Sequence, residues 1–314
     1  MKLVQFFLPG KGKRVGLIRE DRVLDLTLPE DGIRSTLDLI VQGKTAEGLV
    51  TRVTWLAKSL RRKALEYADL HRPPTRRAAH LLLPIDPPEV WAADVASPAD
   101  PVPQGGEAQP TFLFKATAAR CVGPHAPIAI RSDSHLTVPE AELAILLGAS
   151  GSAVAFTVCN DVTARDIVRR GPRHLSRAKT YLGCCALGPC LVTPDELGDP
   201  HALQMRCSIL RQGQTIFSDT ANTARLRFRA EELTGWLQQE NPIPAGSVLA
   251  AGVGIAVPDA AALQAGDRVE IEVQGIGRLS NPVGRPDAES ALPHPGGSWA
   301  AFRPPAGLLR GLGP

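Results

Sequence analysis

The apolar residues of this chain fall into short runs that glycine and proline separate. The clearest runs span residues 141–147, 153–159, 203–210, 247–257 and 268–273. Runs of this length between turn-forming residues are typical of buried strands. The 314 residues include 29 glycines and 28 prolines, which argues against a bundle of long helices. The sequence therefore predicts a fold of the α+β or mostly β class.

The distribution of prolines also predicts how the chain is divided. Residues 1–75 carry alternating strand patterns at 2–7, 14–18 and 21–25, and helical patterns at 37–41 and 48–68, which indicates a small N-terminal domain. Proline-rich residues 76–88 read as a linker. Residues 89–285 form a larger β-rich domain with helices at 163–170 and 229–239. The tail, residues 286–314, is rich in proline, glycine and alanine, and we expect it to be loosely packed or disordered.

Composition and charge exclude several classes of protein. The 35 basic residues against 32 acidic ones give a net charge of only +3, and aromatic residues make up 4%, so nucleic-acid binding is disfavoured. No apolar run approaches the roughly 20 residues of a membrane span, and the N-terminus lacks a signal-peptide pattern. We therefore expect a cytoplasmic protein that does not enter a membrane. The six cysteines form no Cys-x-x-Cys pair, which favours free thiols in the core.

Two carboxylates at the start of one apolar strand are the first candidate site. Glu140 and Glu142 are two residues apart, so on a strand both project to the same side. Two like charges in a partly buried place repel each other, and a hard divalent cation removes that repulsion. The alternative is an exposed strand start with two solvated carboxylates.

A third carboxylate follows the next apolar run. Asp161 lies at the predicted end of that strand, where side chains of neighbouring strands can converge. Thr163 and Asp166 have the spacing of a capping box, which predicts a helix starting there with Arg165 inside it. Three carboxylates would leave positions open on an octahedral Mg²⁺, and these can hold a substrate.

Basic residues follow the acidic ones. A lysine beside a dication and partly desolvated has a lowered pKa, which suits Lys179 to act as a general base; the alternative is a surface lysine. Arginines recur every four residues from Arg165 to Arg177, as in one basic helical stripe, although Gly171 and Pro172 interrupt it. Some of these arginines could hold an anionic substrate, and the competing interpretation is ordinary solvated charge.

These motifs occur in an order that resembles the fumarylacetoacetate hydrolase superfamily. The resemblance rests on the Glu-x-Glu strand, the segment 160–166, the pair Ala178 and Lys179 before Leu-Gly-Pro, and the segments 263–267 and 275–283. It covers roughly residues 85–285. Finer features, such as Phe114-Lys115 and residues 127–133, are similar to the branch that contains 2-keto-3-deoxy-D-arabinonate dehydratase.

The resemblance implies a fold and a set of site residues. It implies a mixed β-sandwich roll with a small N-terminal α+β domain, assembled as a homodimer or homotetramer. It implies that Glu140, Glu142 and Asp161 bind Mg²⁺, with Mn²⁺ or Ca²⁺ as alternatives. It implies that Lys179 is the catalytic lysine. We also expect Arg165 to be catalytic, and Lys115, Arg177 and Val253 to bind substrate.

The sequence also departs from the pattern of that branch. Thr111 stands where the branch carries a glutamate, Val168 replaces another glutamate, and residues 251–254 lack the two threonines of a Thr-Gly-Thr-Gly segment. Two hypotheses therefore remain open. The first is a metal-dependent enzyme that acts on a small anionic 2-oxo acid through an enolate, as a dehydratase or C–C hydrolase of a 2-keto-3-deoxy sugar acid or an acylpyruvate. The second is a catalytically silent relative with a binding or structural role.

Overall fold

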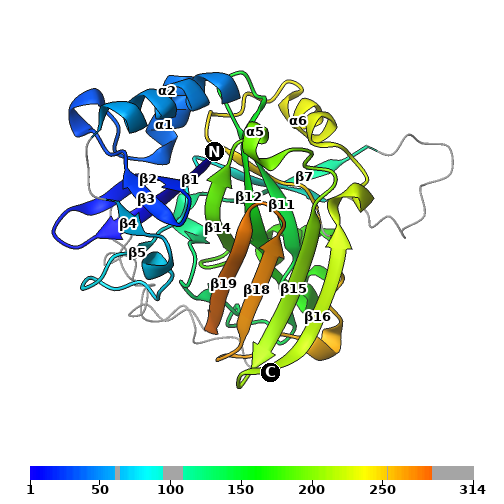
Figure 1. Cartoon of the computed structure of the whole chain (residues 1–314). Coiled ribbons are helices and arrows are strands. Elements are labelled where there is room, and N and C mark those ends of the chain that lie inside the picture. Colours follow the sequence, from blue (N-terminus) through cyan, green and yellow to red (C-terminus); the bar gives the residue numbers. More distant parts are fainter. Residues whose placement is uncertain (61–63, 95–108, 253, 285–314) are drawn as a thin grey trace, which may run out of the picture.

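The computed structural model describes residues 1–60, 64–94, 109–252 and 254–284. Strands dominate these residues and form two main sheets, of twelve and five strands, together with one two-stranded pair (Figure 1). The predicted strand-rich fold is therefore confirmed. No helix in these ranges is long and apolar enough to cross a membrane.

The larger sheet runs through most of the chain. Its main order is β4-β3-β2-β1-β14-β12-β11-β17-β6-β7, while β5 pairs with β1 and β8 pairs with β14. Its strands are β1 (Lys2–Leu8), β2 (Gly12–Arg19), β3 (Arg22–Asp25), β4 (Leu65–Glu66), β5 (His80–Leu81), β6 (Val90–Asp94), β7 (Thr111–Ala116), β8 (Cys121–Val122), β11 (Ala141–Leu147), β12 (Ala153–Asp161), β14 (Cys185–Val192) and β17 (Val248–Ala250).

The smaller sheet stands in front of β11, β12 and β14 in Figure 1. Its order is β16-β15-β18-β19-β9, and β10 and β13 form a separate pair. These strands are β9 (Ile128–Ala129), β10 (Thr137–Val138), β13 (Thr163–Ala164), β15 (Gln204–Arg211), β16 (Gln214–Asn222), β18 (Arg268–Val273) and β19 (Gly277–Gly284).

Helices are short and lie outside the sheets. The α-helices are α1 (Thr36–Gly43), α2 (Ala46–Ser59), α3 (Arg165–Val168), α4 (Leu175–Lys179), α5 (Pro194–Leu197) and α6 (Ala230–Gln238). The 3-10 helices are η1 (Pro29–Asp31), η2 (Ala68–Leu70), η3 (Ala118–Arg120), η4 (Pro172–His174), η5 (Thr223–Arg225) and η6 (Asp259–Ala261). In Figure 1, α1 and α2 lie together at one end of the molecule.

Strand β11 separates two hydrophobic clusters because its side chains alternate between its faces. Leu143 and Ile145 join the cluster that includes residues of β15 and β18 in the smaller sheet. Ala144 and Leu146 join a second cluster that includes the buried faces of α1 and α2. Glu142 is in step with Ala144, so it projects to the face of that second cluster, at the end of the strand.

Several predicted boundaries differ from the structure. The helix predicted at 48–68 ends at Ser59, and two-residue strand β4 follows it. Of the strand predicted at 247–257, only Val248–Ala250 forms a strand among the described residues. The cysteine prediction is confirmed, since all six thiols are free and buried.

The predicted N-terminal domain shares the larger sheet with the rest of the chain. Strand β1 pairs with β2 on one side and with β14 on the other. The proposed linker contains β5, which also pairs with β1, and buried Leu83 and Ile85. The domain boundaries stay a prediction, and the tail at 286–314 lies outside the described residues.

An ion pair between a buried carboxylate and a partly exposed arginine closes the turn before β18. The Asp267 carboxylate is 1% exposed and accepts two hydrogen bonds from Arg211, at 2.9 Å each, and one from the Gln264 N–H at 2.8 Å. Replacing Asp267 by Asn leaves the Arg211 charge without its partner. We expect Asp267→Asn to lower the free energy of unfolding by about 2–4 kcal/mol, measured by urea unfolding.

The pH dependence of this loss has a defined sign. Burial disfavours the Asp267 carboxylate, but the hydrogen bonds from Arg211 and the Gln264 N–H outweigh it and lower its pKa. A carboxyl with a lowered pKa stabilises the fold above its unfolded pKa, and this is lost as pH falls through the folded pKa. The difference between wild type and Asp267→Asn should thus be smaller at pH 3 than at pH 7. Glu272→Gln, at an exposed ion pair 3.4 Å long, is the control; an equal loss there would contradict the prediction.

Candidate functional site

Three carboxylates converge where β11 begins and β12 ends. Glu140 directly precedes β11, Glu142 lies within β11, and Asp161 is the last residue of β12. The two strands are antiparallel, and the Asp161 N–H donates to the Glu140 carbonyl at 2.9 Å. One carboxylate oxygen from each residue lies within 4.8 Å of the others. The predicted convergence is therefore present, and metal binding by these residues stays a prediction.

The chemistry of this cluster fits a hard divalent cation. Glu142 is 1% exposed, and burial followed by the nearby Asp161 charge raises the pKa of its carboxyl group. Its Oε2 accepts the Gly252 N–H at 2.7 Å. Gly252 has a φ of 98°, a left-handed value that favours glycine. A dication would relieve the repulsion among these buried oxygens, which are the ligand type that Mg²⁺ prefers.

Lys179 lies directly against the carboxylates. It is the last residue of α4, and its Nζ lies 2.5 Å from Glu140 Oε2 and 2.8 Å from Asp161 Oδ2. Burial disfavours the ammonium, but the charges of Asp161 and Glu140 outweigh burial and raise the pKa of Lys179. The predicted lowering applies to a lysine beside a bound dication and stays a prediction; with the carboxylates alone, Glu140 and Asp161 hold the proton on the amine.

Lys115 lies behind Asp161, and the predicted contact with substrate is not supported. Its side chain, near the end of β7, is completely buried. Its Nζ lies 2.5 Å from Asp161 Oδ1 and donates to the carbonyls of Val162 at 3.0 Å and Lys179 at 2.5 Å. Asp161 is thus held by a lysine on each of its two oxygens.

The arginines do not form one helical stripe, because the segment is broken at Gly171 and Pro172 into α3, η4 and α4. Arg165 donates to the Val257 carbonyl at 2.7 Å and to Asp259 at 2.9 Å, and Arg169 also pairs with Asp259 at 2.6 Å. Arg177 bonds to Asp133. The guanidinium groups of Arg165 and Arg177 are therefore engaged by acidic side chains of the chain itself.

The predicted capping box is also wrong. Thr163 belongs to β13, where it pairs with Val138, and its hydroxyl donates to the Asp161 carbonyl at 3.1 Å. Asp166 instead accepts from the Ser134 hydroxyl at 2.6 Å. Helix α3 begins at Arg165 without a side-chain cap. Thr163 therefore lies in a strand, although the local sequence pattern predicts that it caps a helix.

Two residues near the site carried no sequence prediction. Gly252 supplies the N–H that binds Glu142. Tyr181, two residues after Lys179, buries its hydroxyl without a hydrogen-bond partner in the described structure, and burial raises its pKa. The position of Tyr181 in the sequence, just after Ala178 and Lys179, could have indicated that it lies near the site. Val253, predicted to bind substrate, lies outside the described residues.

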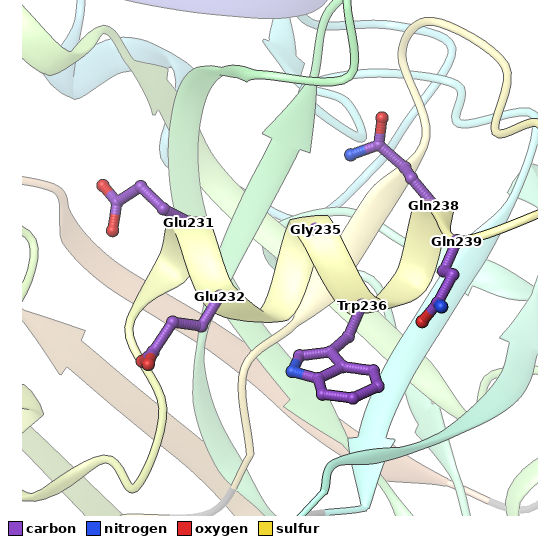
Figure 2. Close-up of a pocket in the computed structure, with 6 residues that line it drawn as sticks. All are labelled: Glu231, Glu232, Gly235, Trp236, Gln238 and Gln239. Carbon is purple, nitrogen blue, oxygen red and sulfur yellow. The ribbon is translucent and has the colours of Figure 1, made fainter.

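A surface groove of about 420 Å³ lies along α6 and is separate from the candidate residues. Figure 2 shows its lining side chains on one helix. They are Glu231, Glu232, Gly235, Trp236, Gln238 and Gln239. None of these residues belongs to the carboxylate cluster, so the groove does not contribute to the site.

Comparison with known families matches the part of the chain that contains these residues. The fumarylacetoacetate (FAA) hydrolase C-terminal family matches residues 90–284, a range that contains the three carboxylates, Lys115 and Lys179. The chain belongs to the fumarylacetoacetate hydrolase family. The predicted family resemblance is thus confirmed.

Relatives within the fumarylacetoacetate hydrolase family extend the match to the N-terminal part. A 2-dehydro-3-deoxy-D-arabinonate dehydratase of Saccharolobus solfataricus is 34% identical over 300 residues, covering 90% of this chain and 96% of the relative. A probable 2-keto-3-deoxyxylonate dehydratase of Haloferax volcanii is 34% identical over 286 residues, covering 86% and 95%. Both relatives are named as enzymes, in agreement with the predicted class.

A solved structure shares the same fold. A 2-keto-3-deoxy-D-arabinonate dehydratase complexed with magnesium and 2,5-dioxopentanoate superposes with a TM-score of 0.77 and 31% sequence identity. The match covers 91% of this chain and 99% of that one. The predicted fold of the fumarylacetoacetate hydrolase family, with its N-terminal part, is therefore confirmed.

Proposed function

We propose that this protein is a divalent-metal-dependent dehydratase of a 2-keto-3-deoxy sugar acid. The observation that carries the proposal is the position of Lys179, whose Nζ lies within 2.8 Å of two of the three clustered carboxylates. An amine and an oxygen-ligand cluster in contact are what proton abstraction next to a carbonyl requires. The likeness to two sugar-acid dehydratases over most of the chain supports this reaction over C–C hydrolysis.

Glu140, Glu142 and Asp161 would hold the cation, with Mg²⁺ as the first choice and Mn²⁺ or Ca²⁺ as alternatives. When bound, a divalent cation supplies the positive charge that polarises the 2-oxo group of an acid chelating it. The complex of the structural relative with magnesium and 2,5-dioxopentanoate supports this assignment.

Lys179 would move the protons. A carboxylate that neutralises a cation holds the Lys179 ammonium less strongly, so its pKa falls toward the range of a base. The neutral amine would take a proton from C3 of the substrate, next to the 2-oxo group. The same proton can then leave with the C4 hydroxyl as water, which balances the elimination. Thr111, where the related branch carries an acid, supplies no ionisable group for this second step.

A second candidate function is a catalytically silent binding protein. Thr111 in place of an acid favours it, as do the pairing of Arg165 with Asp259 and that of Arg177 with Asp133. Such a protein would bind the metal and a small anion without turning the anion over. Its cytoplasmic location and its assembly as a homodimer or homotetramer stay predictions under either function.

Turnover assays distinguish the two functions. We expect 2-keto-3-deoxyarabinonate or 2-keto-3-deoxyxylonate to be consumed in the presence of Mg²⁺. Removal of the metal with EDTA should abolish the reaction, and added Mg²⁺ or Mn²⁺ should restore it. An acylpyruvate serves as the test for C–C hydrolysis. Mg²⁺ binding by calorimetry without consumption of either class would favour the silent protein, and absence of Mg²⁺ binding would contradict both.

A further inference from the structure

Two histidines that are 54 positions apart in the sequence lie in contact. His71 directly follows η2, and His125 lies between β8 and β9. The His125 Nε2 and the His71 Nδ1 are 3.3 Å apart, and the two rings meet edge to face with their centroids 5.5 Å apart. His71 is exposed and His125 is partly exposed, so an ion from solution can approach the pair. Neither histidine belongs to the carboxylate cluster.

The distance between the two nitrogens matches that between two ligands of one metal ion. A histidine nitrogen that binds a tetrahedral ion lies about 2.05 Å from it, so two such nitrogens are about 3.3 Å apart. In the metal-free pair, one ring donates a hydrogen bond to the other across this distance. An ion would replace the shared proton. That proton would move through water to the other nitrogen of its own ring, because a neutral imidazole carries one proton on either nitrogen.

Other parts of the chain hold both histidines in place. The His71 ring packs edge to face on the ring of Tyr67, with the centroids 4.6 Å apart. The His125 N–H donates to the Ser280 carbonyl at 2.7 Å. His125 has a φ of 62°, a left-handed value that few residues other than glycine adopt, with asparagine, aspartate and histidine the most frequent exceptions. Side chains that are positioned before a ligand arrive at a lower entropy cost of binding.

We propose that His71 and His125 form a second metal site, which binds a transition-metal dication such as Ni²⁺ or Zn²⁺ and not Mg²⁺. Imidazole nitrogens suit these ions, whereas Mg²⁺ prefers oxygen ligands. Among the described residues, no third histidine, cysteine or carboxylate lies within 4.8 Å of both ligand nitrogens, so water would complete the coordination. The positive charge of Arg268 acts on His125 and lowers the affinity for any cation. The bound ion would tie the segment after η2 to the turn before β9.

Calorimetry with Ni²⁺ tests this site on the full chain without a histidine tag and with an excess of Mg²⁺ present. We expect the wild type to bind one Ni²⁺ per chain that His125→Asn and His71→Gln each bind at least about tenfold more weakly, because one of two protein ligands is gone. Glu142→Gln, which alters the carboxylate cluster, should retain this Ni²⁺. The urea midpoint of the wild type should also rise with the Ni²⁺ concentration, because an ion that binds the folded chain stabilises it.

The variants are chosen to keep the fold. Asparagine at position 125 tolerates the left-handed backbone. His71→Gln changes an exposed side chain and decides the test if His125→Asn does not fold. The control is His135→Gln, which removes an exposed histidine 3.0 Å from Asp166 and should change the Ni²⁺ affinity less than about threefold.

Three results would overturn the proposal. They are the absence of Ni²⁺ binding by the wild type, an affinity that neither histidine substitution changes, and loss of the bound Ni²⁺ in Glu142→Gln, which would place the ion at the carboxylates. Failure of the wild type to bind Mg²⁺ would instead count against the proposed function and leave this inference intact, because the two sites share no residue.

Discussion

Glu142→Gln is expected to weaken divalent-metal binding by about 100-fold or more without weakening the fold. Glu142 and Asp161 are each only 1% exposed, and the pKa of Glu142 is raised by burial and by the Asp161 charge. An amide of the same shape removes the charge that attracts the cation. Its oxygen can still accept the Gly252 N–H, so the loop after β17 keeps its anchor.

Titration calorimetry with Mg²⁺ measures the affinity, and urea unfolding of the metal-free protein measures stability. The metal-free variant should be at least as stable as wild type, because a buried repulsion is lost. Glu89→Gln is a matched control, since Glu89 accepts the Trp91 indole N–H at 2.9 Å away from the carboxylate cluster. Metal binding by Glu142→Gln equal to wild type would rule out this ligand assignment.

Lys179→Met is expected to reduce turnover strongly while metal binding persists. Loss of a general base typically reduces a rate by about 10²- to 10⁴-fold, so kcat should fall within that range. Mg²⁺ should bind as well as in wild type or more tightly, because the ammonium that competes for Glu140 and Asp161 is gone. Loss of a metal ligand would weaken both turnover and metal binding, whereas loss of a general base should weaken turnover alone.

Steady-state kinetics with a 2-keto-3-deoxy sugar acid and Mg²⁺ calorimetry give the two readouts. The control Lys13→Met, which removes a half-buried lysine paired with Asp86 at 2.6 Å, should leave both unchanged. Turnover by Lys179→Met within tenfold of wild type would remove Lys179 from the mechanism. Loss of Mg²⁺ binding would point to a structural role for its contacts with the carboxylates.

The carboxylate cluster could be predicted because it depends on local strand geometry. The alternation of residues 141–147 places Glu142 on one face of its strand. The apolar run before Asp161 forms the neighbouring strand, and Asp161 lies at its end. Two antiparallel strands joined by a tight turn bring these positions together without information from the rest of the chain. The apolar runs at 141–147 and 268–273 likewise predict the bounds of β11 and β18 correctly.

The environment of the lysines and arginines could not be predicted in this way. Lys115 reaches Asp161 from β7, and Arg165 meets Asp259 across 94 positions of sequence. Such contacts depend on the order of strands in the sheet. Thr163 shows how this order overrides a local pattern, since pairing with Val138 holds it extended where a helix cap was predicted.

The pairing of β1 with β14 has a consequence for the boundaries of a stable fragment. The family match begins at residue 90, but Lys2 and Leu3 lie against Val192 and Leu191 at the end of β14. A polypeptide cut to residues 90–284 would leave those backbone groups of β14 unpaired at an open border. Exposed strand edges pair with strands of other molecules, so we expect the excised segment to self-associate. In the longer chain, β1 pairs with this edge of β14 and prevents such contacts.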